Sequence, residues 1–306
     1  MKKNLKMSAA ILAAVMVMGS LTACGGSSSD PTTAAAAKDT TAAAADSGSS
    51  AAADSGSTTG DVTADVQKII DAGVLKVGVK TDVPCFSLLN TATGEYEGLE
   101  DDLAYNIAGK IFGCTPDEAK EKKLVEFQGV TAKTRGPLVE NGELDMVIAT
   151  FTITEERKET YNFSTPYFTD AVGLLVLKDS GINSIEDLDG KVIGVAQGST
   201  SQKGFEAYVA EKGINVKPTF EEFDGYPALA AALSAKNIDV FSVDRAILAG
   251  YRDDTNKLLD DRYAEQEYGV CTKKENTGLA KLVDGVVTDL KDSGKLAEMI
   301  KDWGIE

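Results

Sequence analysis

The stretch DMVIATFTITEERKETYNFSTPYF, residues 145–168, decides the fold because an expected buried strand runs directly into polar side chains. The apolar run at 145–149 predicts the strand. Three threonines and an arginine follow its carboxyl end: Thr150, Thr152, Thr154 and Arg157. Open α/β sheets bind ligands at that end of their strands. Hydroxyls beside a planar guanidinium suit a carboxylate, which a guanidinium can hold with two parallel hydrogen bonds. The alternative is a surface arginine paired with Glu155 or Glu156.

Expected strands and helices alternate on both sides of this stretch. Apolar or alternating runs predict strands at 75–80, 123–127, 172–178, 191–197, 220–223 and 238–244. Apolar spacing, caps and prolines predict helices at 99–113, from Thr115, near Pro137 up to 141–142, at 200–212 and after Pro227. This alternation implies an α/β fold of mostly parallel sheets with right-handed crossovers. Because the pattern occurs twice, we expect two lobes.

Polar residues fall at the ends of four expected strands. Lys80 ends the strand at 75–80, and Thr150 follows the strand at 145–149. Residues 197–200 lie at the start of an expected helix, and Asp244 ends the strand at 238–244. One small zwitterion would satisfy such a set, because it offers both a carboxylate and an ammonium group. The alternative is that each is a solvated loop side chain.

The amino-terminal residues are typical of a targeting signal. Three lysines precede an apolar run at 9–18 that is too short to span a bilayer, and LTAC ends at Cys24. We expect a lipoprotein signal peptide at 1–23, with Cys24 lipidated. Residues 24–60 are almost entirely Gly, Ser, Ala, Thr and Asp, so a lipid-anchored disordered tether is expected there. The alternative is a cleaved secretion signal in which Cys24 is coincidental.

Charge and composition exclude several functions. The formal net charge of −17 argues against nucleic acid as a partner. The absence of histidine removes His-based catalysis and His-ligated metals. It also predicts that ligand affinity varies little between about pH 6 and 8, unless the pKa of a cysteine or carboxylate is perturbed. Cys85, Cys114 and Cys271 lack CxxC spacing, so neither a metal nor a disulfide framework is indicated. We expect no cofactor and no enzyme activity.

Several motifs together resemble a known family. They include GVKTDVP (78–84), GLEDDLA (98–104), TAKTRGPLVENGELDMVIATFTITEERK (131–158), LDGKVIGVAQGSTSQK (188–203) and EQEYGV (265–270). The chain resembles the polar-amino-acid substrate-binding proteins of ABC importers, and more closely the aspartate/glutamate-binding members. The similarity runs from about Leu75 to the carboxyl terminus.

The resemblance implies a two-lobed periplasmic-binding-protein type II fold that closes on its ligand. Lobe 1 would comprise 61–166 and 269–306, and lobe 2 would comprise 172–263. The two hinge segments would be 167–171 and 264–268. Each lobe is expected to be a mostly parallel sheet flanked by helices.

The resemblance also assigns one end of the ligand. Arg157 and Thr152 would hold the α-carboxylate, assisted by backbone amides near Ser199 and Thr200. Asp244 would accept from the α-ammonium group.

The other end of the ligand would meet residues of both lobes. Lys80, Arg135 and Thr150 match the positions that hold a side-chain carboxylate, and Tyr226 matches a second-lobe contact. Phe86 would lie against the ligand, with a place in the core as the alternative.

Two departures from the family pattern bear on the ligand. Cys85 replaces the residue before the aromatic, and Ala196 stands where glutamine binders can carry a lysine, which speaks against glutamine. The expected function is therefore capture of aspartate or glutamate and delivery to an ABC permease with its cytoplasmic ATPase. Glutamine or another polar amino acid is the alternative, followed by a sensory ectodomain or an enzyme on the same fold. We expect a monomer on the outer face of the cytoplasmic membrane, or in the periplasm.

Overall fold

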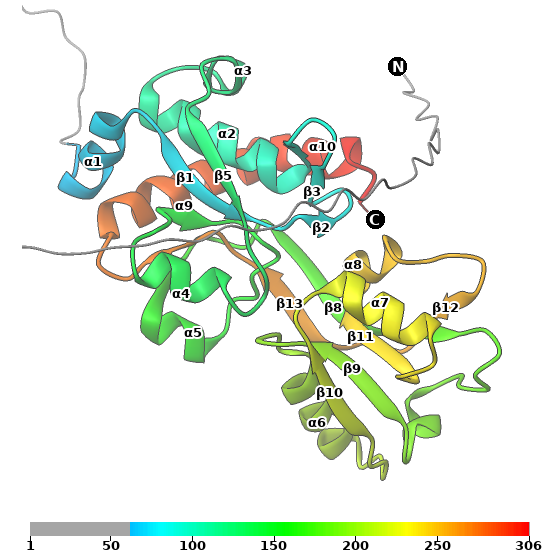
Figure 1. Ribbon diagram of the computed structural model, residues 1–306. Coiled ribbons are helices and arrows are strands. Elements are labelled where there is room, and N and C mark those ends of the chain that lie inside the picture. The colour runs from blue at the N-terminus through cyan, green and yellow to red at the C-terminus, as the bar shows by residue number, and fades with distance from the viewer. Residues whose placement is uncertain (1–61, 306) are drawn as a thin grey trace, which may run out of the picture. The chain divides into compact units, whose positions relative to one another are not determined.

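The computed structural model describes residues 62–305, which form two β-sheets flanked by helices and a smaller third sheet (Figure 1). The first sheet has the strand order β5-β1-β6-β14-β7. Its strands are β1 (Leu75–Val79), β5 (Val125–Gly129), β6 (Met146–Val147), β7 (Tyr161–Phe163) and β14 (Cys271–Lys273). The carboxyl-terminal β14 thus completes a sheet that the amino-terminal part of the described chain begins.

Helices surround this first sheet. They are α1 (Ala64–Ala72), α2 (Leu99–Phe112), α3 (Pro116–Glu121), α4 (Arg135–Glu140), α5 (Glu155–Thr160), α9 (Thr277–Asp292) and α10 (Lys295–Asp302). The third sheet is formed by β2 (Asp82–Val83), β3 (Ser87–Asn90) and β4 (Glu95–Glu97). It lies between β1 and α2 in the chain.

The second sheet has the order β10-β9-β11-β8-β12, and β13 also pairs with β8. Its strands are β8 (Phe168–Leu177), β9 (Val192–Ala196), β10 (Thr219–Phe223), β11 (Val240–Asp244), β12 (Asn256–Leu258) and β13 (Tyr263–Tyr268). Its helices are the short 3₁₀ segment η1 (Ile185–Leu188), α6 (Ser201–Lys212), α7 (Tyr226–Ser234) and α8 (Arg245–Ala249). Both α6 and α7 pack against β9.

Both large sheets are mixed rather than mostly parallel. In the first sheet β1 is parallel to β5 and β6, but β14 is antiparallel to β6 and β7. In the second sheet β9 is parallel to β10 and β11, whereas β8 is antiparallel to β11, β12 and β13. The expectation of mostly parallel sheets was wrong because one strand next to the crossings in each sheet, β14 in the first and β8 in the second, is antiparallel to all of its neighbours.

The long helix of the first half follows from its sequence. Leu103, Ile107 and Ile111 are buried on one face of α2. Gly113 ends the helix with φ 67°, a left-handed conformation that glycine adopts without a steric penalty. The next helix, α3, begins with a capping box between Thr115 and Glu118.

The expected strand at 145–149 is shorter in the structure. Only Met146 and Val147 form β6, although the run from Met146 to Ala149 is fully buried. Thr150 then has φ 46°, which is rare for a β-branched residue. The chain leaves the sheet early and bends sharply where ligand-binding residues were expected.

The main chain crosses between the two large sheets at β8 and β13, which run side by side (Figure 1). The two strands are antiparallel, with Phe168 opposite Tyr268 and Ala171 opposite Glu265. Both expected hinge segments include residues of these strands. The exact lobe bounds stay a prediction.

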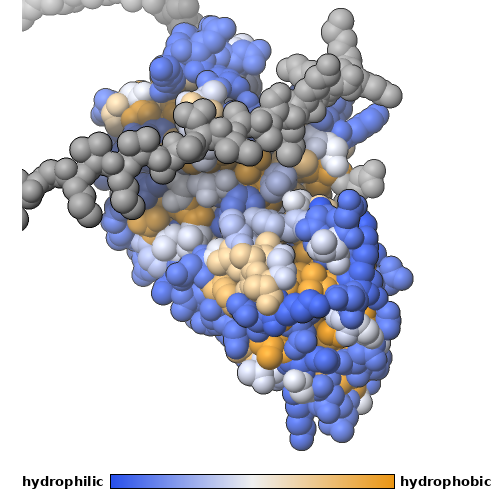
Figure 2. Space-filling view, turned by 45° about the vertical axis from the view of Figure 1, so that its right-hand side comes forward, coloured by the Kyte–Doolittle hydropathy of each residue, from blue (hydrophilic) through white to orange (hydrophobic). Residues whose placement is uncertain are grey.

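The surface of the described residues is largely polar. Hydrophilic residues cover most of the face shown in Figure 2, with apolar residues between them. Among the described residues, only Val62 and Leu88 are large apolar side chains classed as exposed. Within 62–305, no helix is both long and apolar enough to cross a membrane. The expected signal peptide, Cys24 and tether lie outside the described residues.

Candidate functional site

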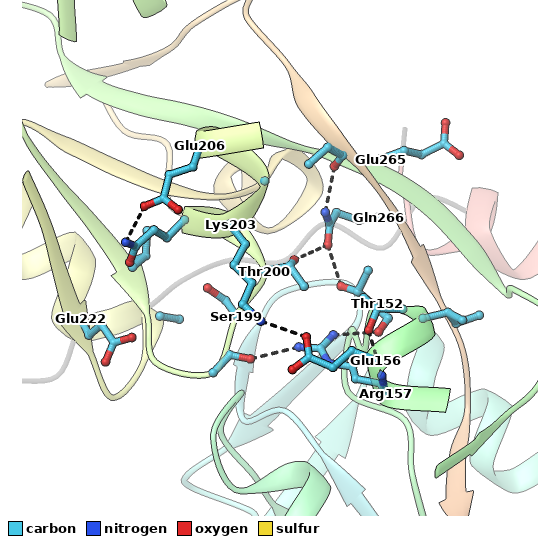
Figure 3. Close-up of a pocket in the computed structure, with 18 residues that line it drawn as sticks. Thr152, Glu156, Arg157, Ser199, Thr200, Lys203, Glu206, Glu222, Glu265 and Gln266 are labelled. Carbon is cyan, nitrogen blue, oxygen red and sulfur yellow. Dashed lines mark hydrogen bonds and ion pairs between the residues drawn. The ribbon is translucent and has the colours of Figure 1, made fainter. Parts of the chain in front are cut away.

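The Arg157 guanidinium bridges the two halves of the chain. Its Nη1 donates to the carbonyl oxygen of Thr152 at 2.7 Å, and its Nη2 donates to the carbonyl oxygen of Gly198 at 3.0 Å (Figure 3). Thr152 follows β6 of the first sheet, whereas Gly198 follows β9 of the second. Burial and the nearby Arg135 lower the pKa of Arg157 to about 9, which leaves the guanidinium charged at neutral pH.

The glutamates beside Arg157 have other partners. Glu155 pairs with Lys158 at 2.8 Å, and Glu156 pairs with Lys203 at 2.9 Å. The alternative of a surface arginine paired with one of these glutamates therefore does not describe the structure. The pair between Glu156 and Lys203 is a second link between the halves.

A threonine that looked like a ligand group instead sets the position of Arg157. Thr154 is the N-cap of α5, and its Oγ1 accepts a hydrogen bond from the backbone N–H of Arg157 at 3.1 Å. An N-cap hydroxyl satisfies one of the free amides in the first helical turn. Thr154 therefore fixes the helix that presents the guanidinium.

Gln266 forms hydrogen bonds with the hydroxyls of Thr152 and Thr200. Its Oε1 accepts from Thr152 Oγ1 at 2.6 Å and from Thr200 Oγ1 at 2.7 Å (Figure 3). No role was predicted for Gln266 from the sequence. The available signal was its place in the quoted EQEYGV motif on an expected hinge segment. The backbone N–H of Ser199 donates to the carbonyl oxygen of Ala196 at 3.0 Å, so that amide is already engaged.

Lys80 lies where β1 ends and is only 1% exposed. Its Nζ is 3.2 Å from Asp82 Oδ1 and 4.5 Å from the ring centre of Tyr226. A further, longer hydrogen bond of 3.4 Å reaches the carbonyl oxygen of Val130. Burial lowers the pKa of Lys80, and Asp82 opposes this effect. Tyr226 begins α7, so this contact also spans both halves.

Arg135 lies beneath the bend at Thr150. Its Nη1 donates to the carbonyl oxygens of Ala149 at 2.5 Å and Thr150 at 2.9 Å, and its guanidinium stacks 4.2 Å from the ring centre of Phe151. Within the described part of the chain, Arg135 Nε and Thr150 Oγ1 are buried without a hydrogen-bond partner. Buried polar atoms are normally paired, so these two donors are available to a ligand.

Asp244 ends β11 and is 6% exposed. It accepts a hydrogen bond from the Tyr268 hydroxyl on β13. Burial raises the pKa of Asp244 to about 7, while the hydrogen bond from Tyr268 and the charges of Arg135 and Arg157 lower it. A carboxylate that is costly to ionise alone is stabilised when an ammonium group arrives beside it.

Phe86 is buried against the crossing strands. Its ring meets Phe168 edge-on with centroids 5.2 Å apart and Tyr268 with centroids 6.0 Å apart. It is 1% exposed, which fits the core alternative. Through Tyr268, the packing of Phe86 supports the position of Asp244.

Glu100 was not expected to take part in the site. It lies in the first turn of α2, fully buried, and its Oε1 accepts from the Thr150 N–H and from the Tyr167 hydroxyl, both at 2.6 Å. Acidic residues are common in first helical turns because they favour the positive end of the helix dipole. That general preference gave no reason to single out Glu100 from GLEDDLA.

A pocket of about 880 Å³ opens between the halves beside Arg157 (Figure 3). Four expected ligand residues line it: Thr152, Arg157, Ser199 and Thr200. The other six are buried and do not line it: Lys80, Phe86, Arg135, Thr150, Tyr226 and Asp244. Arg135 nevertheless lies close enough to influence the pKa values of Lys80, Tyr226 and Asp244.

Four of the expected ligand residues are charged: three cations, which donate hydrogen bonds, and one carboxylate, which accepts them. Lys80, Arg135 and Arg157 offer N–H groups to carboxylates, and Asp244 offers oxygen to an ammonium group. Among the described residues, no group of three or more acidic or cysteine side chains is arranged to hold a metal ion. The arrangement suits binding of an amino acid.

The comparisons with known proteins define the class. A family model described as bacterial extracellular solute-binding proteins, family 3, matches residues 75–306, and the chain belongs to this family. It has the two-domain α/β periplasmic-binding-protein type II fold and is an amino-acid solute-binding protein of ABC transport. A mutant of ArgBP from T. maritima superposes with a TM-score of 0.67 at 27% identity, covering 79% of this chain and 100% of that one.

Three relatives of similar sequence are named for the amino acid that they bind. The glutamine-binding protein of Geobacillus stearothermophilus is 40% identical over 222 residues, or 72% of this chain and 80% of that protein. The ABC transporter glutamine-binding protein GlnH of Bacillus subtilis is 35% identical over 238 residues, or 77% and 82%. The glutamate-binding protein GluB of Corynebacterium efficiens is 28% identical over 245 residues, or 76% and 79%. The expected closeness to aspartate/glutamate binders is thus not supported, because the glutamine-binding relatives are more similar.

Proposed function

We propose that the chain is an extracytoplasmic receptor that holds an amino acid with an acidic side chain between its two halves and delivers it to an ABC importer. The observation that carries the proposal is the set of charged groups brought together from both halves. Arg157 would bind the α-carboxylate with the guanidinium N–H groups that the two carbonyl oxygens leave free. Asp244 would receive the α-ammonium group.

The donors at the other end of the site favour a side-chain carboxylate. Lys80 Nζ and Arg135 Nε can only donate, whereas Thr150 Oγ1 can donate or accept, and the last two have no partner within residues 62–305. An amide would place its own two hydrogens among these donors. A buried donor left without an acceptor costs roughly 1–3 kcal/mol.

The balance of charges supports the same ligand class. The buried or partly buried charged groups around the expected ligand contacts are Lys80, Arg135, Arg157, Asp82, Asp244, Glu100 and Asp101. Burial raises the pKa of Glu100 to about 7 and that of Asp101 to about 9. When Glu100 and Asp101 are protonated and Asp82 and Asp244 are ionised, the three cations outnumber the two carboxylates by one. A ligand with a net charge of −1 neutralises that excess.

Glutamine is the second candidate, and the names of the two more similar relatives favour it. One buried acceptor, Glu100 Oε2, lacks a hydrogen-bond partner among the described residues and offers a place for an amide NH₂. Asp82 Oδ1, which Lys80 Nζ approaches at 3.2 Å, is a second acceptor. Ala196, which the sequence analysis took as a sign against glutamine, is a buried residue at the end of β9 and lies on the pocket wall.

Titration calorimetry with glutamate, aspartate, glutamine and asparagine separates the two candidates. For the full-length chain at pH 6.5 we expect the acids to bind at least about tenfold more tightly than the amides, which corresponds to about 1.4 kcal/mol. Glutamine binding more tightly than both acids would overturn the acidic assignment and leave the α-carboxylate and ammonium contacts standing.

The proposed setting is the outer face of the cytoplasmic membrane, with lipid on Cys24 as the anchor. The support is the sequence pattern that ends in LTAC and the tether that follows it. A monomeric receptor on such a tether would meet the permease with its cytoplasmic ATPase at a membrane surface.

A further inference from the structure

Glu100 is a buried carboxyl group beneath the site, and both of its hydrogen-bond donors are uncharged. Oε1 accepts from the Thr150 N–H and the Tyr167 hydroxyl, each at 2.6 Å. Oε2 is buried and lacks a partner among the described residues. A buried polar atom without a partner is unusual and calls for an explanation.

Through Thr150, Glu100 supports a strained part of the site. Thr150 has φ 46°, and its N–H points to Glu100 while its carbonyl oxygen accepts from Arg135 at 2.9 Å. A strained conformation persists only when surrounding contacts determine it. Glu100 therefore holds the backbone N–H of Thr150, and Arg135 holds its carbonyl oxygen.

Through Tyr167, Glu100 also reaches the crossing strands. The Tyr167 N–H donates to the carbonyl oxygen of Tyr268 at 2.9 Å, and the Tyr268 hydroxyl donates to Asp244. One carboxyl group is thus connected to the residues at both ends of the proposed ligand.

Several charged groups act on Glu100. The cations Arg135, at the start of α4, and Lys80, after β1, favour its ionised form. Asp101, beside it on α2, is itself held protonated at neutral pH, because burial raises its pKa to about 9. Burial is the largest effect and raises the pKa of Glu100 to about 7, against the hydrogen bonds from Tyr167 and Thr150. Both forms are therefore populated near neutral pH.

We propose that Glu100 is a positioning residue whose charge sets the preference of the site between a carboxylate and an amide side chain. This inference rests on the proposed function. Ionised Glu100 offsets the charge of Arg135 and leaves no excess of cations, which favours a neutral amide. Protonated Glu100 leaves one excess positive charge, which favours a carboxylate. Glu100 acts through Arg135 and Thr150.

The sign of the pH dependence follows from linkage. A ligand carboxylate stabilises protonated Glu100, so affinity for glutamate is greatest at low pH and falls as pH rises through about 7. Asp244 also titrates near pH 7, but it faces the α-ammonium group that both ligands carry. The ratio of the two dissociation constants, glutamine over glutamate, cancels that contribution and reports on Glu100.

The test compares this ratio in the full-length chain and in Glu100→Gln between pH 6 and 8. The glutamine side chain keeps an oxygen that can accept from Thr150 and Tyr167, and it removes the charge. In the wild type we expect the ratio to fall by about tenfold from pH 6 to 8. In Glu100→Gln we expect a ratio that stays at its pH 6 level across the range. Asp101→Asn, which changes a neighbouring buried carboxyl group that accepts from Ser87, is the matched control and should keep the wild-type profile.

The outcomes separate the two proposals. Equal weakening of both ligands in Glu100→Gln, with the pH profile of the ratio retained, would show a purely structural role and overturn the inference. A wild type that prefers glutamine at every pH, together with a ratio that shifts toward glutamate in Glu100→Gln, would overturn the acidic assignment and support the role of Glu100. Binding of neither ligand by the wild type would overturn both.

Discussion

At the scale of single residues, the placement of Arg157 depends on neighbours that do not bind the ligand themselves. The Thr154 hydroxyl caps α5, and the carbonyl oxygens of Thr152 and Gly198 orient the guanidinium. A guanidinium held in one orientation loses less side-chain entropy when a carboxylate binds. The same contacts make Arg157 part of the closed arrangement of the two halves.

Replacing Arg157 by alanine should weaken every amino-acid ligand. Removing one partner of a buried charge pair costs roughly 2–5 kcal/mol, so a micromolar site would weaken by about 30-fold or more. Calorimetry on Arg157→Ala measures the loss. Lys203→Ala, which removes only the exposed pair with Glu156, is the control and should change affinity by less than about threefold. An Arg157→Ala variant that binds ligands as well as this control would show that Arg157 does not hold the α-carboxylate.

Sequence patterns located the charged residues at strand ends but not the groups that balance them. Lys80, Thr150 and Asp244 follow strands whose apolar patterns are plain. Glu100 was missed because an acidic residue in a first helical turn is normally a surface feature. The expectation of a flat pH profile held only if no carboxyl pKa is perturbed, and it stays a prediction. Because burial raises the pKa values of Glu100 and Asp244 to about 7, we now expect affinity to depend on pH.

At the scale of elements, the crossing strand β13 carries a residue that forms hydrogen bonds with both halves. Gln266 on this strand accepts hydroxyl hydrogens from Thr152, which follows β6, and from Thr200, the N-cap of α6. A single amide oxygen thus joins two loops and a crossing strand. Its bonds require the loops to be close together, so they favour the closed arrangement.

Replacing Gln266 by alanine should weaken ligand binding mainly by faster release. The two hydroxyls lose their common acceptor, and each buried hydrogen bond is worth about 0.5–1.5 kcal/mol. We expect dissociation to accelerate by roughly 5- to 100-fold in stopped-flow experiments, with little change in association. Glu265→Gln alters the exposed neighbour on the same strand and should leave both rates near wild type. An unchanged dissociation rate in Gln266→Ala would show that the hydrogen bonds of Gln266 to Thr152 and Thr200 do not retain the ligand.

Long elements could be predicted from the sequence, and short ones could not. The helices α2 and α6 and the strands β1, β8, β9 and β11 lie where apolar periodicity and glycine stops placed them. The brief strands β2, β3, β4, β7 and β14 contain too few residues for a periodic signal. The antiparallel pairing of β14 also depends on a partner more than 100 residues away, which no local pattern encodes.

At the scale of the whole molecule, the two large sheets of residues 62–305 are joined by two strands that cross between them. The first sheet is completed by the carboxyl-terminal β14, so neither half is simply one end of the chain. A ligand held by Arg157 on one side and Asp244 on the other stabilises the closed arrangement by the difference in its affinity for the closed and open forms.

The proposed lipid anchor on Cys24 is tested on the full chain. Cys24→Ala should release the protein from membranes of its native host and leave amino-acid affinity unchanged, because the expected lipid site lies outside the binding domain. Membrane fractionation followed by immunoblotting measures the distribution. One acyl chain gives only marginal membrane binding, so stable retention of the wild type implies more than one. Wild-type protein found entirely in the soluble fraction would contradict the anchor.

A crystal structure of the chain with bound glutamate tests the central claim most directly. We predict density for the ligand between the two sheets, with its α-carboxylate on Arg157 and its α-ammonium group on Asp244. The side-chain carboxylate should contact Lys80 and Arg135. Glutamate bound with neither Arg157 nor Asp244 within hydrogen-bonding distance would contradict the account.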